Sequence, residues 1–360
     1  MSHHALAVEI SVPGIDIHRL ARAQDPGLAT EFHRWPLPDY VWPALERCYR
    51  SIYCSESQLR ISGGITPRIE TWVARRDGCI SAVILFERHQ HQIRVLNEVF
   101  VLSAQVLDEF ADAVFELYPK LHMIRIHAVR IAALPKQYIS LSAVVSDDYL
   151  LKLPSSAEQW QRSLSARTRE KLRYYLRRAQ QRAPTFSFRT FVSNEISLAQ
   201  IKQIIQFNRA RMQVKGKRFG MSAIEERQIC QIVLERGQLS IIEIDGQPCA
   251  GLLCTSVGGE IFMHVIAHDP AYDDLRLGLL CCALTIEDAI AKGCQQFHFL
   301  WGRYDYKTRL GGEREVLSQV LVFRDVWSLV QQPGLLAAHT WAWARASARA
   351  WVRRQRQRQR

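Results

Sequence analysis

The stretch that decides the fold is residues 239–257, which read LSIIEIDGQPCAGLLCTSV. Two apolar runs flank a central Asp-Gly pair, and this arrangement is the strongest short-range signal of a β-hairpin. A third apolar run follows at Glu260–Ala267, and after it come a helical pattern at Leu277–Lys292 and a strand at Gln296–Leu300. This order predicts an antiparallel meander followed by a crossover helix.

The same order occurs earlier in the chain. Residues 69–87 read IETWVARRDGCISAVILFE, which is again two apolar runs around an Asp-Gly pair. A strand, a helix and a strand are expected after it at Ile93–Val101, Ala104–Leu117 and Met123–Val129. Helical patterns precede the two hairpins at Tyr40–Ser57 and Ile196–Met212. We therefore expect an α/β fold of two tandem units with mixed, mostly antiparallel sheets and crossover helices.

This repeat divides the chain into four expected segments. They are an irregular, proline-containing leader at 1–38, an N-terminal lobe at 39–150, a C-terminal lobe at 151–330 and a basic tail at 331–360. An Arg-rich linking helix is expected at 156–183. Ser155 and Glu158 have the spacing of a capping box at its start, and Pro184 prevents its continuation.

The net charge of +12 is concentrated in two places. Nine basic residues and one acid lie between Gln161 and Arg189, and seven arginines with no acid lie between Arg345 and Arg360. Both patches favour an anionic partner, such as the inner face of a cell membrane or a membrane synthase. The tail suits an amphipathic helix on anionic lipid, and it is equally compatible with a solvated chain end.

The cysteine pattern indicates a reducing compartment. The nine cysteines include no C-x-x-C pair and mostly lie within apolar patterns, which is typical of buried thiols. The sequence begins without a basic segment followed by an apolar one, and no apolar run approaches the roughly 18 residues that a membrane span needs. We therefore expect a cytoplasmic protein, with peripheral membrane contact through its basic patches.

Several enzyme classes have no support in the sequence. It contains no G-x-S-x-G, H-E-x-x-H or Walker pattern, which excludes the motif-based readings of serine hydrolase, zincin and P-loop protein. His89 and His91 have the look of a metal pair, but they fall at a hairpin tip without a nearby cysteine or acid cluster. A solvated turn is the better interpretation, so no metal is expected.

The two units differ in the link between the third strand and the crossover helix. In the first unit Phe100 leads almost directly into the helix, without a glycine. The second has a longer loop with Arg276 and Gly278 at the mouth of its helix, where free backbone N–H groups suit a pyrophosphate. Asp273 and Asp274 in the same loop oppose an anion. Only the second unit is expected to hold a phosphorylated cofactor.

Residues 293–311 carry a family resemblance. They read GCQQFHFLWGRYDYKTRLG and resemble the "G…FDF…G…YK" pattern of the CelD-like, cellulose-biosynthesis branch of the GNAT acyltransferases. Tyr149–Leu153, the Arg-rich helix, Asp269-Pro270 and Leu277–Leu280 also follow in the family's order. The resemblance extends over Tyr149–Phe323, and it departs from the pattern at His298, where the family usually has Asp.

The resemblance implies an acyltransferase that uses acetyl-CoA or another acyl-CoA. Its pyrophosphate would bind at Arg276, Leu277, Gly278, Leu279 and Leu280, and its pantetheine would run beside Val265 and Ile266. The family also implies the acceptor, an amino or hydroxyl group on a sugar-containing precursor of surface or extracellular polysaccharide.

Acyl transfer needs a base for the acceptor and a donor for the departing thiolate. His264 lies in the middle of a strand, where it is either that base or a hydrogen-bonded core histidine. His298 on the next strand is either the base or a partner of His264. Tyr306 either donates a proton to the thiolate or packs.

Three further residues are candidates for substrate binding. Lys307 and Arg309, beside Asp305, offer cations that would neutralise a phosphate on the acceptor. The alternative is that Lys307 pairs with Asp305 or Glu313.

Two other functions remain open. Fem-type transferases, which take an aminoacyl group from tRNA, share a doubled architecture, and the Arg-rich helix would then grip RNA. Nucleic acid is the less favoured partner, because the sequence lacks the long coiled-coil insertion of many such proteins. The third possibility is a non-catalytic subunit that docks on a membrane polysaccharide synthase.

Overall fold

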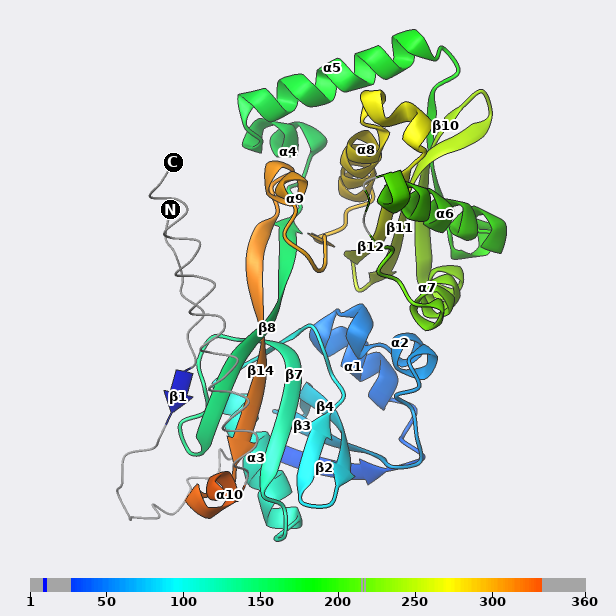
Figure 1. Ribbon diagram of the computed structural model, residues 1–360. Coiled ribbons are helices and arrows are strands. Elements are labelled where there is room, and N and C mark those ends of the chain that lie inside the picture. The colour runs from blue at the N-terminus through cyan, green and yellow to red at the C-terminus, as the bar shows by residue number, and fades with distance from the viewer. Residues whose placement is uncertain (1–8, 12–26, 215, 217, 332–360) are drawn as a thin grey trace. The chain divides into compact units, whose positions relative to one another are not determined.

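A computed structural model describes residues 9–11, 27–214, 216 and 218–331 of the chain (Figure 1). Two compact units are present. Unit 1 takes its described residues from Met1–Tyr49, Ile65–Ser146 and Val316–Arg360, and unit 2 consists of Arg50–Gly64 and Asp147–Glu315. The predicted α/β class, with mostly antiparallel sheets and crossover helices, is confirmed. The basic tail predicted at 331–360 lies outside the described residues, except for residue 331.

Unit 1 is one twisted sheet with helices against it. The strands, in spatial order, are β2 (Leu28–Arg34), β3 (Ile69–Arg76), β4 (Cys79–His89), β5 (Gln92–Val95), β7 (Met123–Ile131), β14 (Glu313–Phe323) and β8 (Ile139–Lys152). Two short strands extend it, β6 (Phe100–Leu102) beside β7 and β1 (Glu9–Ser11) beside β8. The helices are α1 (Val41–Tyr49), α3 (Ala104–Leu117) and α10 (Val326–Val330).

Unit 2 repeats this plan. Its strand order is β8, β13 (Gln296–His298), β12 (Glu260–His268), β11 (Gln247–Val257), β10 (Gly237–Ile244) and β9 (Ser187–Val192). Its helices are η1 (Ile52–Cys54), α2 (Glu56–Ile61), α4 (Ala157–Ser163), α5 (Ala166–Arg182), η2 (Ser193–Glu195), α6 (Leu198–Val214), α7 (Ala223–Arg236), η3 (Pro270–Leu275), α8 (Leu277–Ala291) and α9 (Asp305–Arg309). One core joins the sheet to α8, and a second joins its other face to α6 and α7.

The two Asp-Gly hairpins form as predicted. Asp77 and Gly78 have φ of 50° and 77°, and Asp245 and Gly246 have φ of 53° and 71°. Two successive positive φ angles match the turn that closes a twisted two-residue hairpin, and Asp and Gly both tolerate this conformation. The local turn therefore sets the register of β3 with β4 and of β10 with β11.

The prediction of an irregular leader is corrected by β2. This strand pairs with β3 from Leu28 to Arg34, inside the segment that the prolines suggested was irregular. Pro36 lies beyond the end of the strand and interrupts no pairing, so prolines near this segment did not indicate an irregular chain.

The helix expected at 40–57 is three short helices. Arg50 has a left-handed φ of 48° and ends α1, and the Ser55 side chain caps α2 by accepting the Gln58 N–H. These two residues interrupt what would otherwise be a continuous helix. As a result α1 belongs to unit 1, whereas η1 and α2 belong to unit 2.

The Arg-rich helix expected at 156–183 is also divided. Its first cap is Ser156 rather than Ser155, since the Ser156 side chain accepts the Gln159 N–H. Leu164 is extended, and Ser165 caps a second helix by accepting the Thr168 N–H. The result is the short helix α4 followed by the long basic helix α5.

Each unit is built from separate segments of the chain, because two long strands, β8 and β14, pass from one unit to the other. β8 follows the first repeat in sequence, yet its last residues pair with β13 of unit 2. β14 follows the second repeat, yet it pairs with β7 of unit 1. The expected lobes at 39–150 and 151–330 therefore do not coincide with the two compact units.

Candidate active site

The sheet of unit 2 opens between two parallel strands. β12 and β13 pair only over Glu260↔Gln296, Ile261↔Phe297 and Phe262↔His298. β12 then continues to His268 without β13 beside it. In unit 1 the strand that corresponds to β13 is β7, and it pairs first with β5 and then with β6, the strands that correspond to β12. The opening is therefore a feature of unit 2, and among the described strands none pairs with this edge of β12 after Phe262.

A buried charge cluster fixes the point where the two strands separate. The two ring nitrogens of His298 lie 2.8 Å from an Asp148 oxygen and 3.0 Å from a Glu260 oxygen. The ring also stacks on Phe262, with centroids 4.3 Å apart. His298 thus joins β8, β12 and β13 at the last paired position, and its side chain is almost fully buried.

The loop after β13 is held in place by Lys307. Leu300 has a left-handed φ of 52°, so the chain turns there, and α9 follows shortly after. The buried Lys307 ammonium donates to the carbonyl of Leu300 at 2.8 Å and to that of Trp301 at 2.5 Å. Burial lowers the pKa of Lys307 to about 8. Its side chain is part of the framework of the opening.

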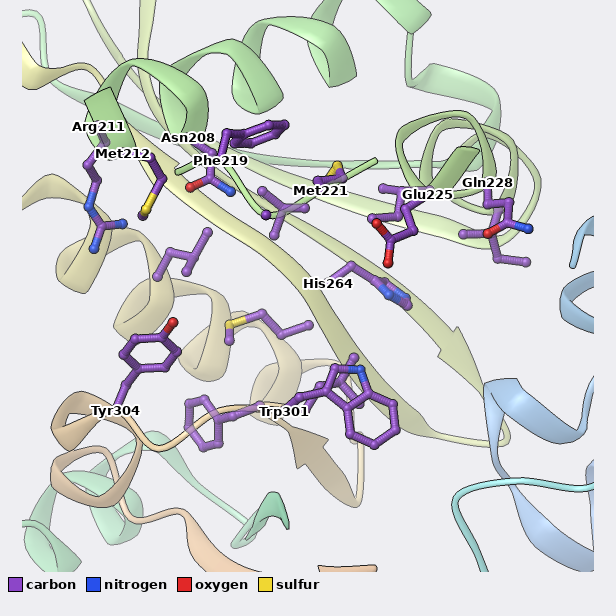
Figure 2. Close-up of a pocket in the computed structure, with 18 of the residues that line it drawn as sticks. Asn208, Arg211, Met212, Phe219, Met221, Glu225, Gln228, His264, Trp301 and Tyr304 are labelled. Carbon is purple, nitrogen blue, oxygen red and sulfur yellow. The ribbon is translucent and has the colours of Figure 1, made fainter. Parts of the chain in front are cut away.

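A pocket of about 720 Å³ occupies this opening (Figure 2). Its walls are Met263–Ile266 of β12, Phe299–Trp301 after β13, and side chains of α6, α7 and η1. Figure 2 shows the His264 ring pointing from β12 into the pocket, with Arg211 and Met212 on the α6 side and Trp301 on the opposite side. Every lining residue belongs to unit 2.

His264 carries a neutral ring at neutral pH. Burial lowers its pKa to about 4, and its Nε2 lies 2.8 Å from the buried hydroxyl of Thr255. If Nε2 donates its hydrogen to this hydroxyl, Nδ1 is left as a proton acceptor. The partly buried ring therefore has the state that a general base requires, although its basicity is low.

Tyr306 is protonated over the whole working range of pH. Burial raises the pKa of its hydroxyl well above the ordinary value, and the charge of Arg211 opposes this only in part. The ring stacks with Tyr304 and packs edge-on against Phe299. A tyrosine in this state can donate a proton but cannot serve as a base.

The expected pyrophosphate loop lies away from this pocket. Arg276 caps α8 with a left-handed φ of 54°, and the next residues enter the core. A Cβ on Gly278 would lie 2.9 Å from Nδ1 of His268, so the close approach that this glycine permits is that of a histidine ring. None of the five residues from Arg276 to Leu280 lines the pocket.

The two acids of this loop are both paired. Asp273 accepts from His268 at 3.1 Å, and Asp274 lies 2.9 Å from Arg178 and 2.5 Å from Arg182 of α5. The guanidinium groups of Arg178 and Arg182 offset the charge of Asp274, and that of Arg276 lies 3.8 Å from Asp273.

The structure brings together five of the predicted site residues. They are His264, Val265, Ile266, Tyr306 and Lys307, all of which line the pocket. His298 is buried in the charge cluster instead. Asp305 and Arg309 are exposed, lie 3.4 Å apart in an ion pair, and do not line the pocket.

The sequence reasoning missed the arginine of this pocket. Arg211 on α6 has a buried Nε with no hydrogen-bond partner among the described residues. Asn208, Arg211 and Met212 have the i, i+3, i+4 spacing of one helix face, which was the available signal. Tyr53 was missed because the expected helix at 40–57 assigned it to the other unit.

Metal ligands are not gathered in the described part of the chain, where no cluster of three or more His, Cys, Asp or Glu side chains could hold an ion. None of the helices described is both long enough and apolar enough to span a membrane.

Comparisons with known proteins agree with this geometry. Residues 166–308 match a family model described as an acetyltransferase (GNAT) domain, and this match includes α5 to α9 and most of the pocket. No curated protein matches the sequence.

Solved structures extend the similarity to both units. FemX superposes with a TM-score of 0.58 at 11% identity, covering 81% of this chain and 96% of FemX. A conserved protein of unknown function from Bacteroides thetaiotaomicron VPI-5482 gives a TM-score of 0.51 at 13% identity, covering 79% and 96%. A tandem GNAT protein from the clavulanic acid biosynthesis pathway gives 0.39 at 10% identity, covering 82% and 98%. At such identities the structures show the fold alone, and the sequence similarity to the acetyltransferase (GNAT) domain is that of residues 166–308.

Proposed function

We propose that the protein transfers an acyl group from acyl-CoA to an amino or hydroxyl group of a sugar-containing precursor of surface or extracellular polysaccharide. The observation that carries the acyl-transfer part is the opening between β12 and β13, with a pocket lined by Met263–Ile266 of β12 and by Phe299–Trp301 after β13. The acceptor class is supported by the resemblance to the CelD-like branch and by the character of the lining residues.

The residues of unit 2 fit an acyl-CoA. The edge of β12 after Phe262 offers backbone N–H and C=O groups that suit the amides of an extended pantetheine arm. The N-terminus of α8 and Arg276, whose guanidinium lies 3.8 Å from Asp273, suit the pyrophosphate, since Arg178 and Arg182 already pair with Asp274. When bound, acyl-CoA supplies a thioester carbonyl as the electrophile and a thiolate as the leaving group.

Two side chains of the pocket, His264 and Tyr306, each carry out one of the two proton transfers that the reaction needs. His264 accepts the proton of the acceptor's amino or hydroxyl group as the new bond to the acyl carbon forms. Tyr306 donates its proton to the sulfur as the carbon–sulfur bond breaks, and solvent reprotonates it. The low pKa of His264 keeps the base free, and the high pKa of Tyr306 keeps the acid loaded.

The lining also suits a sugar that carries an anionic group. Tyr53, Trp301 and Tyr304 present aromatic rings, on which the apolar faces of sugars can stack, and Asn208 offers hydrogen bonds. Arg211 is a partly buried cation of the pocket, and its buried Nε, which has no hydrogen-bond partner among the described residues, suits a phosphate or carboxylate. In this proposal Arg211, and not Lys307 or Arg309, neutralises a phosphate on the acceptor.

Charge reversal at the start of α8 should weaken the binding of acyl-CoA. Arg276→Glu is expected to raise the Kd for acetyl-CoA about tenfold, because it puts a third acid beside Asp273 and Asp274 at the proposed pyrophosphate position. Calorimetric titration measures this, with Arg227→Glu on the exposed face of α7 as the matched control. Equal Kd values for the two variants would contradict the assignment.

The activity should have a broad pH plateau. His264 must be neutral to act as the base, so kcat/KM should decline only as the pH falls toward about 4. The charge of Lys307 is lost above pH about 8, and we expect activity to decline there as the loop loosens. A pH profile with an acid limb near 6.5, the ordinary pKa of histidine, would argue against His264.

A second candidate is aminoacyl transfer from tRNA. The fold similarity to FemX over both units favours it. A donor assay with purified protein separates the two proposals: turnover of acetyl-CoA supports the first, and turnover of aminoacyl-tRNA alone supports the second. Neither donor turning over in a folded, acceptor-supplied enzyme would favour the non-catalytic subunit.

A further inference from the structure

Helix α5 has two rows of side chains that the proposed active site does not use. One row, at i, i+4, i+7 and i+11, is Arg167, Lys171, Tyr174 and Arg178. The other, with the same spacing, is Arg169, Arg173, Leu176 and Gln180. Residues with this spacing share one helix face, so each row forms a stripe along the helix. The two rows are offset by two residues, or about 200°, so they run along opposite flanks of the helix. Tyr174 stands half exposed in the middle of its row.

Most of this charge has no acidic partner within unit 2. Asp274 engages Arg178 and Arg182, and Arg169 donates to backbone carbonyls. In the part of the chain that the structure describes, four exposed cations of α5 take part in no ion pair: Arg167, Lys171, Arg173 and Arg177. Their charge is available to an anionic partner over the length of the helix.

An apolar groove lies directly beside the second row. It has a volume of about 100 Å³ between α4, α5 and α8. Six of its lining residues are aliphatic: Leu164, Leu172, Leu176, Leu280, Ala283 and Leu284. Gln161 and Glu287 also line it, and the Gln161 amide donates to the Glu287 carboxylate at 2.6 Å. Arg169 and Arg173 line the same groove, so guanidinium groups and a hydrocarbon surface are adjacent.

We propose that α5 and this groove dock on a bilayer that contains anionic phospholipid. The cations bind headgroup phosphates, Tyr174 lies at the interface between water and lipid, and the groove takes a segment of one acyl chain. A bilayer fits better than RNA, because a nucleic acid has no aliphatic chain to fill a groove of leucines. This inference does not rest on the proposed function, since no residue of α5 lines the active-site pocket.

Vesicle co-sedimentation with the full chain tests this surface. The probes are vesicles of phosphatidylcholine alone and of phosphatidylcholine with phosphatidylglycerol. The test variant is the triple substitution Arg167→Gln, Lys171→Gln and Arg173→Gln. The matched control is Lys152→Gln, Lys202→Gln and Arg227→Gln, three exposed cations elsewhere in unit 2. Both variants keep the basic tail, so its contribution is equal.

The wild type and the control should bind the anionic vesicles and not the neutral ones. The α5 triple should bind about a hundredfold more weakly, because each cation near an anionic surface contributes to the attraction. Leu284→Gln should weaken binding about tenfold by making the groove polar.

Equal partitioning of the α5 triple and the control would overturn the proposal, as would equal binding of the wild type to neutral vesicles. Binding of labelled RNA that depends on the three cations, without binding to vesicles, would overturn it in favour of a nucleic acid. Thermal melting of each variant confirms that it is folded before these results are compared.

Discussion

Replacing His264 with alanine is expected to lower kcat for acyl transfer by about 10²–10⁴-fold. The ring is the titratable base on the wall of β12, and burial lowers its pKa to about 4, so the neutral form prevails in solution at neutral pH. The Kd for acetyl-CoA should stay near the wild-type value, because the proposed contacts of the cofactor are with backbone groups and with Arg276.

The tautomer of His264 provides a matched control. Thr255→Val removes the hydroxyl that lies 2.8 Å from Nε2 while keeping the shape of the side chain. We expect a smaller loss of kcat than for His264→Ala, because the ring remains but its orientation is less defined. Single-turnover kinetics with saturating acetyl-CoA measures both variants. If His264→Ala retains full kcat, His264 is a core histidine and not the base.

Replacing Lys307 with methionine is expected to lower both stability and activity. Methionine fills a similar volume but leaves the carbonyls of Leu300 and Trp301 without their donor. The methionine avoids the cost of burying a charge, which the lowered pKa of Lys307 reflects. An unsatisfied buried carbonyl costs about 1–3 kcal/mol, so we expect the free energy of unfolding to fall by about 2 kcal/mol.

Arg309→Met on the same short helix is the control for Lys307. Arg309 is exposed and pairs only with exposed Asp305, so its loss should change the free energy of unfolding by less than about 0.5 kcal/mol. Urea unfolding measures both variants, and kcat should fall for Lys307→Met alone because its loop forms a wall of the pocket. Equal stability of the two variants would show that Lys307 does not hold the loop.

Local signals in the sequence predicted the repeated meander well. The two Asp-Gly turns fix their hairpins by backbone preference, and Ser103 starts α3 at its predicted bounds of Ala104–Leu117. The crossover helix of unit 2 was also predicted to within one residue. Each of these elements depends on residues that are close together in the chain.

Long-range pairing is what the sequence left open. β14 pairs with β7, which lies nearly two hundred residues earlier in the chain, and no local sequence pattern identifies that partner. For the same reason Asp148, which meets His298 across the sheet, was not assigned a role. The departure from the family pattern at His298 has a physical account in the structure, because Asp148 and Glu260 supply the acids that receive its ring nitrogens.

The site was predicted in part for similar reasons. His264 and Tyr306 were identified because their residue types suit proton transfer, and both line the pocket. Arg211 and Tyr53 were missed because they reach the pocket from α6 and η1, which are separated in sequence from β12. Gly278 was given a phosphate-binding role when its immediate neighbour is the ring of His268.

The most direct test of the account is a calorimetric titration of acetyl-CoA into the wild type and two tryptophan variants. Ile266→Trp places a large ring in the pocket beside β12, and Val101→Trp places the same ring at an exposed position on β6 of unit 1. The account predicts one saturable site in the wild type and in folded Val101→Trp, and its loss in folded Ile266→Trp. No binding by the folded wild type, or binding that Ile266→Trp leaves unchanged, would contradict acyl-CoA-dependent transfer at the opening of unit 2.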